Sequence, residues 1–116
     1  MNITRVYSDE SGESHFADLP IDLHDAGEIG KLSAPMPANA VIFRTNDAGY
    51  DYDWHVTPAR QLIVLLDGAI EIEVSDGIRR EFRGGEILLM EDVTGRGHRT
   101  KHVEPRKRRS LFITLD

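Results

Sequence analysis

The fold of this 116-residue chain is decided by residues 49–68, which read GYDYDWHVTPARQLIVLLDG. Within that stretch an apolar, β-branched run begins at Gln61 and ends in an Asp-Gly pair, which is typical of a hairpin turn. On extended chain, His55 and Thr57 point to the same face, about 7 Å apart along the backbone. Gln61 shares that face by parity, provided that no bulge intervenes around the preceding proline. The stretch therefore predicts extended chain that gathers polar side chains on one face.

Short strands separated by turn residues are predicted for the rest of the chain. No window sustains an apolar period of 3.6 residues for three turns, and the prolines and glycines of the first half exclude a long helix there. In the second half, Ile70, Ile72 and Val74 alternate with glutamates, as in a strand with one buried face. This pattern and spacing predict an all-β fold, an antiparallel barrel or sandwich. The predicted strands are residues 3–7, 41–45, 61–66, 69–74, 78–82, 86–90, 98–103 and 110–115.

The composition limits the classes of function. A mass of 13.1 kDa fits one domain, and 20 acidic against 14 basic residues argue against broad nucleic-acid binding, which needs a basic face. The chain has no cysteine, which excludes disulfides and thiolate metal sites and suits a cytoplasmic protein. The longest aliphatic run, residues 62–66, is far shorter than the ~20 residues of a membrane span. We therefore expect a cytoplasmic domain with no membrane partner, and we see no signal-peptide pattern.

One basic run stands out against this acidic balance. Residues 106–109 read RKRR, and we expect them to form a solvated loop before the last strand. The alternative is a contact with nucleic acid or with an anionic ligand.

The spacing of the motif residues resembles the cupins, a family of jelly-roll barrels. The first cupin motif reads glycine, five residues, His-any-His, three or four residues, glutamate, six residues, glycine. Gly49, His55 and Gly68 match it by identity, whereas Thr57 replaces the second histidine and Gln61 replaces the glutamate. In the second motif, the histidine corresponds to His98, Gly95 precedes it at the family spacing, and His102 takes the asparagine position. Counted forward from Gly85, Glu91 falls at the proline position, so this loop is two residues longer than the family pattern.

The resemblance implies an antiparallel jelly-roll β-barrel and raises the question of a metal. Cupins with the full pattern hold iron, manganese, nickel or zinc on three histidines and a glutamate. Carried over to this chain, the ligands are His55, Gln61 and His98, of which only the two imidazoles are good ligands. We therefore expect either a divalent transition metal (Ni, Zn, Mn or Fe) or a metal-free polar pocket.

The remaining candidates surround that pocket. The longer loop could swing the carboxylate of Glu91 inward as a general acid or base, and His102 shares a face with His98, about 13 Å further along the strand. We name Glu91 and His102 as candidate catalytic residues. The candidate substrate-binding residues are Arg44, which could hold an anion, Tyr52 and Thr57. For each of them, ordinary packing or solvation is the alternative.

The resemblance favours an enzyme of the isomerase, lyase or hydrolase type, dependent on a divalent metal and acting on a small polar or anionic metabolite. The alternative is a non-catalytic cupin that binds or senses a small molecule, with or without a metal, and a purely structural barrel is the third hypothesis. We expect residues 1–39 to supply an N-terminal strand and an irregular segment that packs on the barrel or at a dimer interface. Residues 40–116 would form the barrel. Small cupins commonly pair through strands, so we expect a homodimer.

Overall fold

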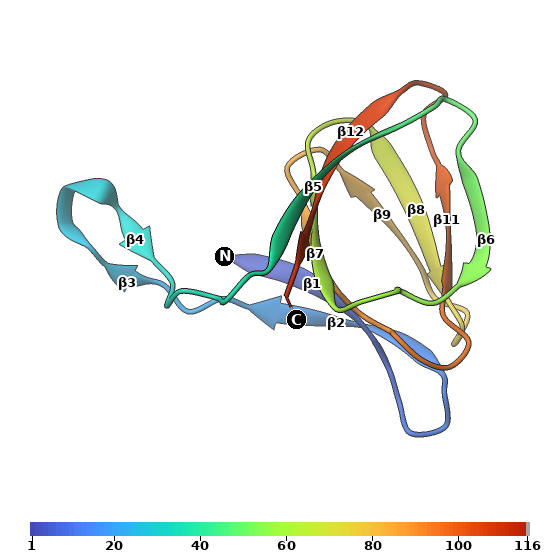
Figure 1. Cartoon of the computed structure of the whole chain (residues 1–116), viewed down its shortest axis with the longest axis horizontal. Coiled ribbons are helices and arrows are strands. Elements are labelled where there is room, and N and C mark those ends of the chain that lie inside the picture. Colours follow the sequence, from blue (N-terminus) through green and yellow to red (C-terminus); the bar gives the residue numbers. More distant parts are fainter. Residues whose placement is uncertain (116) are drawn as a thin grey trace.

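Two β-sheets pack face to face as an open barrel in the computed structural model, which describes residues 1–115 (Figure 1). The large sheet has the strand order β2-β1-β10-β7-β12-β5, and the small sheet has the order β6-β11-β8-β9. The prediction of an all-β jelly-roll fold is confirmed, and one strand pair, β1 with β10, is parallel. The strands of the two sheets are β1 (Asn2–Ser8), β2 (Ser14–Pro20), β5 (Ala40–Asn46), β6 (Asp51–His55), β7 (Gln61–Leu65), β8 (Ala69–Val74), β9 (Arg79–Arg83), β10 (Ile87–Glu91), β11 (His98–His102) and β12 (Arg108–Thr114).

The hydrophobic core follows from the alternation that the sequence displays. In β8 the side chains of Ile70, Ile72 and Val74 are buried between the sheets, while the intervening glutamates face outward. Burying a side chain of this kind contributes roughly 1.5–3 kcal/mol. The main cluster joins both sheets, so it fixes the spacing between them. Its buried members are Val6, Leu65, Ile70, Ile72, Val74, Phe82, Leu88 and Met90.

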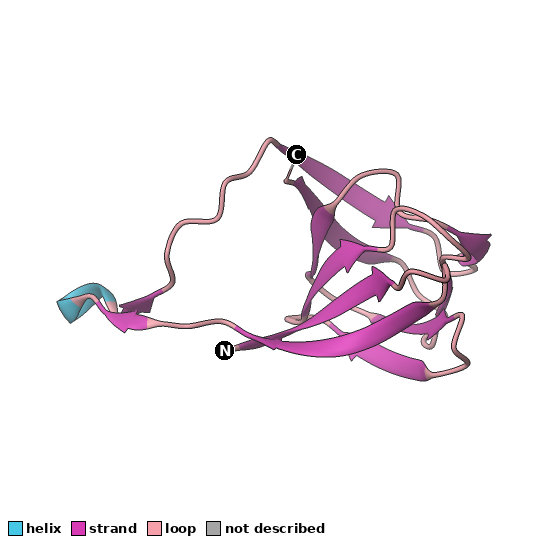
Figure 2. Ribbon diagram, turned by 90° about the horizontal axis from the view of Figure 1, so that it is seen from below, coloured by secondary structure: helices cyan, strands magenta, loops and turns pink. Residues whose placement is uncertain are grey.

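The N-terminal part of the chain divides into two pieces. β1 lies between β2 and β10, with Thr4 opposite Leu88, so this hairpin belongs to the large sheet. The chain then leaves the barrel as an arm, built from β3 (His24–Asp25), a 3-10 turn η1 (Gly27–Ile29) and β4 (Lys31–Leu32), and returns at β5. Figure 2 shows the arm projecting away from the two sheets. Its residues are exposed, and no helix among residues 1–115 has the length and apolarity to span a bilayer.

The ring of His15 ties the β1–β2 hairpin to the small sheet. Its Nε2 lies 2.7 Å from Oδ2 of Asp9 in the hairpin turn, and its Nδ1 lies 2.7 Å from Oδ2 of Asp76 in the β8–β9 turn. Both ring nitrogens can donate only when the imidazole is protonated. The hydrogen bond with Asp9, followed by that with Asp76, raises the pKa of His15 above its ordinary value. The carboxyl of Asp9 has its pKa lowered, chiefly by the same contact.

We predict that this contact makes the stability of the fold depend on pH. Because the folded-state pKa of His15 is raised, its contribution is complete below the unfolded pKa of about 6.5 and is lost as pH rises through the folded pKa. His15→Gln should therefore lower the urea midpoint at pH 6 and lower it much less at pH 9. His24→Gln, on the exposed arm, is the matched control and should leave the midpoint unchanged at both values. An equal loss at pH 6 and pH 9 in His15→Gln would contradict the assignment.

Candidate functional site

A cavity of about 450 Å³ lies between the sheets. Among the described residues that line it, none is an aspartate or a glutamate, and the walls are mainly aliphatic and aromatic. Its polar lining comes from both sheets, since β6 and β11 supply one side and β5, β7 and β12 the other. The polar and aromatic members are Arg44, Tyr50, Tyr52, His55, Thr57, Gln61, His98, Thr100, Arg108, Phe112 and Thr114.

The structure brings the two motif histidines together at the cavity. His55 is directly opposite His98 in the β6–β11 ladder, and their ring centroids are 4.4 Å apart. Between His98 and Thr100 the register slips by one residue, so that Tyr52 faces Thr100. This bulge turns Tyr52 into the cavity, where its ring stacks on that of His55 with a centroid distance of 3.6 Å. Parity along the strand would have placed Asp53 there instead.

Hydrogen bonds hold both imidazoles in one tautomer. Nδ1 of His55 lies 2.7 Å from the backbone carbonyl oxygen of Asp53, and Nδ1 of His98 contacts the carboxylate of Asp92. Both partners are acceptors, so each Nδ1 carries a proton, and when the ring is neutral its Nε2 keeps a lone pair. Burial is the main cause that lowers the pKa of His55, which favours its neutral form. In their neutral forms the two rings therefore offer two imidazole nitrogens with lone pairs.

Asp92 is a site residue that the sequence analysis missed. Its side chain is 0% exposed, and besides His98 it accepts a hydrogen bond of 2.7 Å from the hydroxyl of Thr57. The backbone N–H of Thr57 also donates to the Asp92 carbonyl. Thr57 and Asp92 thus form the support behind His98. The available signal was the pair of acids at residues 91–92, of which only one can face inward on extended chain.

Glu91 faces away from the cavity, so the expectation that it swings inward is wrong. It is the last residue of β10 and pairs with Arg5 of β1 and with Arg60. Partial burial opposes ionisation, but hydrogen bonds from Arg60 and Arg5 hold the pKa of Glu91 below its ordinary value. A carboxylate fixed by two guanidinium groups on the outside of the barrel has no access to a ligand inside it.

His102 also has a different place from the one expected of a catalytic base. Its Nδ1 lies 3.2 Å from the carbonyl oxygen of Ala48, and its Nε2 accepts a hydrogen bond of 3.0 Å from Nε of Arg108. Both ring nitrogens are therefore engaged, and the ring positions Arg108. The prediction that residues 106–109 form a solvated loop is wrong for Arg108, which begins β12 and is 1% exposed.

Arg44 and Gln61 also line the cavity. Nε of Arg44 donates to the hydroxyl of Ser110 at 3.0 Å, and its guanidinium lies over the ring of Phe112. Gln61 opens β7 and is 6% exposed. Thr57 reaches the cavity too, but its hydroxyl is committed to Asp92.

Comparison with solved structures identifies the fold of the barrel. The cupin domain of Cnp3 from Schizosaccharomyces pombe matches with a TM-score of 0.54 and 15% identity, covering 100% of this chain and 83% of that one. The chain has the cupin fold. SPY1581 from Streptococcus pyogenes, a conserved protein of unknown function, matches with a TM-score of 0.52 and 21% identity, covering 66% of this chain and 62% of that one. NMB1881 from Neisseria meningitidis matches with a TM-score of 0.51 and 20% identity, covering 66% of this chain and 72% of that one.

These likenesses establish the fold alone, because all of them lie below 25% identity. The match spans less than two thirds of the Streptococcus chain. No protein-family profile matches the sequence. No curated protein matches it either. The function of this cupin barrel therefore has to be argued from its own residues.

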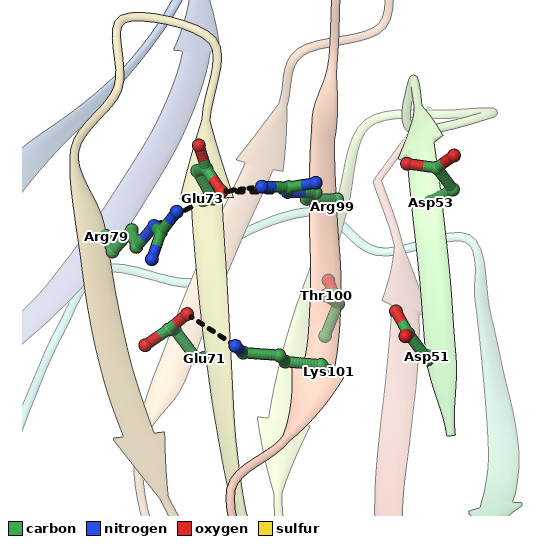
Figure 3. Close-up of a pocket in the computed structure, with 8 residues that line it drawn as sticks. All are labelled: Asp51, Asp53, Glu71, Glu73, Arg79, Arg99, Thr100 and Lys101. Carbon is green, nitrogen blue, oxygen red and sulfur yellow. Dashed lines mark hydrogen bonds and ion pairs between the residues drawn. The ribbon is translucent and has the colours of Figure 1, made fainter. Parts of the chain in front are cut away.

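A second hollow lies on the outer face of the small sheet (Figure 3). Here the glutamates that alternate with the core residues of β8 meet basic side chains from the flanking strands. Glu73 pairs with Arg99 at 2.6 Å and Arg79 at 3.2 Å, and Glu71 pairs with Lys101 at 3.5 Å. This groove is the solvated, charge-paired face of the sheet whose other face lines the cavity. Its lining residues are Asp51, Asp53, Glu71, Glu73, Arg79, Arg99, Thr100 and Lys101.

Gly97 allows β6 to approach the loop that carries His98. Its φ is +72°, and a Cβ there would lie 2.0 Å from the carbonyl oxygen of His55. We predict that Gly97→Ala destabilises the cupin barrel by about 1–2 kcal/mol for the left-handed backbone and a further ~1–3 kcal/mol for the clash. Gly77→Ala is the matched control, since its φ is +96° with nothing within 4 Å of the added Cβ. Equal losses for both in urea unfolding would refute the close approach.

We predict that Asp92 fixes the tautomer of His98. Asp92→Ala leaves the Thr57 hydroxyl and the His98 Nδ1–H without their acceptor, which should cost about 2–5 kcal/mol. In ¹⁵N spectra of the imidazoles, wild-type His98 should appear as the Nδ1–H tautomer and Asp92→Ala as a mixture. Thr57→Val, which removes one hydrogen bond from the same carboxylate, should keep the Nδ1–H tautomer. A single unchanged tautomer in Asp92→Ala would show that the carboxylate does not set it.

Proposed function

We propose that this cupin-fold protein is an enzyme that binds a small polar or anionic metabolite inside its barrel and holds a divalent transition metal ion on His55 and His98. The observation that carries the proposal is the pair of imidazoles at the cavity, each with its Nδ1 occupied and its Nε2 free. Imidazoles that bind metals are commonly oriented in this way by an acceptor on the other nitrogen.

The donor set decides which ions suit the site. Among residues 1–115, no three His, Cys, Asp or Glu side chains are grouped to hold a metal. The donors are therefore the two imidazoles together with the amide oxygen of Gln61, which also lines the cavity. Imidazole suits zinc, nickel and iron, whereas manganese prefers carboxylates. The residues fit a zinc or nickel ion best, and the neutral amide in place of a carboxylate predicts modest affinity.

The chain's own residues account for binding and orientation. Tyr52 fixes the plane of the His55 ring, and Asp92 fixes that of His98. The walls are largely apolar, which strengthens the polar contacts that a bound ligand makes inside the cavity. A bound ion would supply Lewis acidity, which polarises a carbonyl oxygen of the substrate. Because the pKa of His55 is lowered, its free nitrogen is available to an ion or to a substrate proton near neutral pH. Such a site suits an isomerase, lyase or hydrolase.

The second candidate function is non-catalytic binding of a small molecule. Neither candidate for proton transfer is available in the cavity, and this favours binding without catalysis. Glu91 is held by arginines outside the cavity, and His102 is engaged at both ring nitrogens. Incubation of the metal-loaded protein with a panel of small organic acids, followed by NMR, separates the two. Conversion of a panel member by the wild type but not by His55→Ala supports the enzyme. Binding without conversion supports the alternative.

We predict that untagged, chelator-treated protein binds one zinc or nickel ion. His55→Ala and His98→Ala should each weaken binding at least 100-fold, because each removes one of two strong donors. Gln61→Glu should tighten it about tenfold, since a carboxylate neutralises charge. Isothermal titration calorimetry at pH 7.5 measures the affinity of all five proteins, the control below included. His24→Ala, which removes an exposed arm histidine, should bind like the wild type. Affinities that are the same in His55→Ala and His24→Ala would exclude the site.

A further inference from the structure

Arg108 is the most unusual side chain of the barrel interior. It is 1% exposed, and its Nη1 and Nη2 have no hydrogen-bond partner among the described residues. Only its Nε is used, in the bond to His102. Burying a guanidinium charge without an acceptor costs free energy, and proteins normally pair such a group. A cationic group in this state at the wall of a cavity has the properties of a ligand contact.

A second arginine faces the same space. Arg44 of β5 is opposite Ser110 of β12, two residues from Arg108, so both arginines point to the inner face. Burial, together with the positive charge of Arg44, lowers the pKa of Arg108 to about 10. Tyr50 lies beside both guanidinium groups, with ring distances of 5.4 Å to Arg108 and 5.9 Å to Arg44. Two positive charges therefore meet in a cavity whose described lining contains no acid.

The two polar groups of the cavity lie toward opposite ends. Arg108 is held by His102, which is four residues from His98 on β11 and hence about 13 Å away along the strand. Tyr50 and Tyr52 occupy the wall between them, with ring centroids 6.3 Å apart. The rest of that space is bounded by apolar side chains from both sheets, namely Ile42, Ile63, Ile70, Ile72, Met90 and Phe112.

We propose that Arg44 and Arg108 form an anion subsite and that the ligand of the cavity is an organic acid. Its carboxylate lies against the free guanidinium nitrogens, and its apolar body extends along the tyrosines toward His55 and His98. A planar carboxylate matches the fork of N–H groups that Arg108 leaves unused, and it supplies the missing negative charge. The subsite itself follows from the arginines alone. That the far end of the acid reacts rests on the proposed function.

Calorimetric titration with straight-chain carboxylic acids from acetate to octanoate tests the subsite. The chain-length series should show binding that strengthens as methylenes fill the apolar walls, and the matching primary amides should bind at least tenfold more weakly. Arg108→Met should weaken binding of the best acid about 10- to 100-fold, because it removes charge-assisted hydrogen bonds. Arg108→Lys keeps the charge but loses the fork, so a loss of about tenfold is expected. Arg109→Met is the control, since the neighbouring side chain pairs with Asp67 outside.

Three outcomes would overturn the subsite: no acid of the series binds the wild type, Arg108→Met binds as tightly as Arg109→Met, or inorganic phosphate binds more tightly than any carboxylate. Should the Met variant fail to fold, the Lys variant and the acid–amide comparison decide the matter. The failures of the two proposals are distinguishable. If acids bind to His55→Ala and the wild type has no affinity for metal, only the proposal of a metal-dependent enzyme is refuted. If the wild type binds metal but no acid, only the proposal of the anion subsite is refuted.

Discussion

The buried carboxylate of Asp92 is the contact on which the site depends. It follows β10 of the large sheet and accepts hydrogen bonds from Thr57, after β6, and from His98 at the start of β11. One side chain thus joins the two sheets and sets the ring of His98. Because both of its side-chain partners are donors, it holds Thr57 and His98 together and so keeps the His98 ring beside His55. A solvated acid would impose no such constraint.

The stability of the barrel and the chemistry of its cavity come from different residues. The aliphatic cluster around Val6, Leu88 and Val74 holds the sheets together. That cluster allows the cavity wall to carry groups that cost stability, such as the unpaired guanidinium of Arg108. Gly68 lies against the Arg108 side chain, since a Cβ at this position would lie 2.8 Å from the Cβ of Arg108. The glycine that ends the first motif therefore makes room for the buried arginine.

The sequence predicts the parts of this structure that repeat or obey parity. Alternation in β8 predicts its buried face, and the motif spacing predicts that His55, Gln61 and His98 reach one cavity. Parity failed where the chain departs from regular pairing: the bulge that turns Tyr52 inward is not encoded in any alternation. In the longer loop, the sequence does not show which of the adjacent acids Glu91 and Asp92 faces inward. Nor does the basic run 106–109 show that Arg108 begins a strand and faces inward.

The two residues that depart from the cupin motif, Thr57 and Gln61, are both neutral. Thr57, in place of a histidine, gives its hydroxyl to Asp92 and so belongs to the support of the site. Gln61, in place of a glutamate, leaves the described cavity lining without a negative charge. A glutamate there would add a negative charge to the cavity and oppose the entry of an anionic ligand. With a neutral amide at this position, the two guanidinium groups are the charged groups of the described lining, and the proposed anion subsite uses both of them.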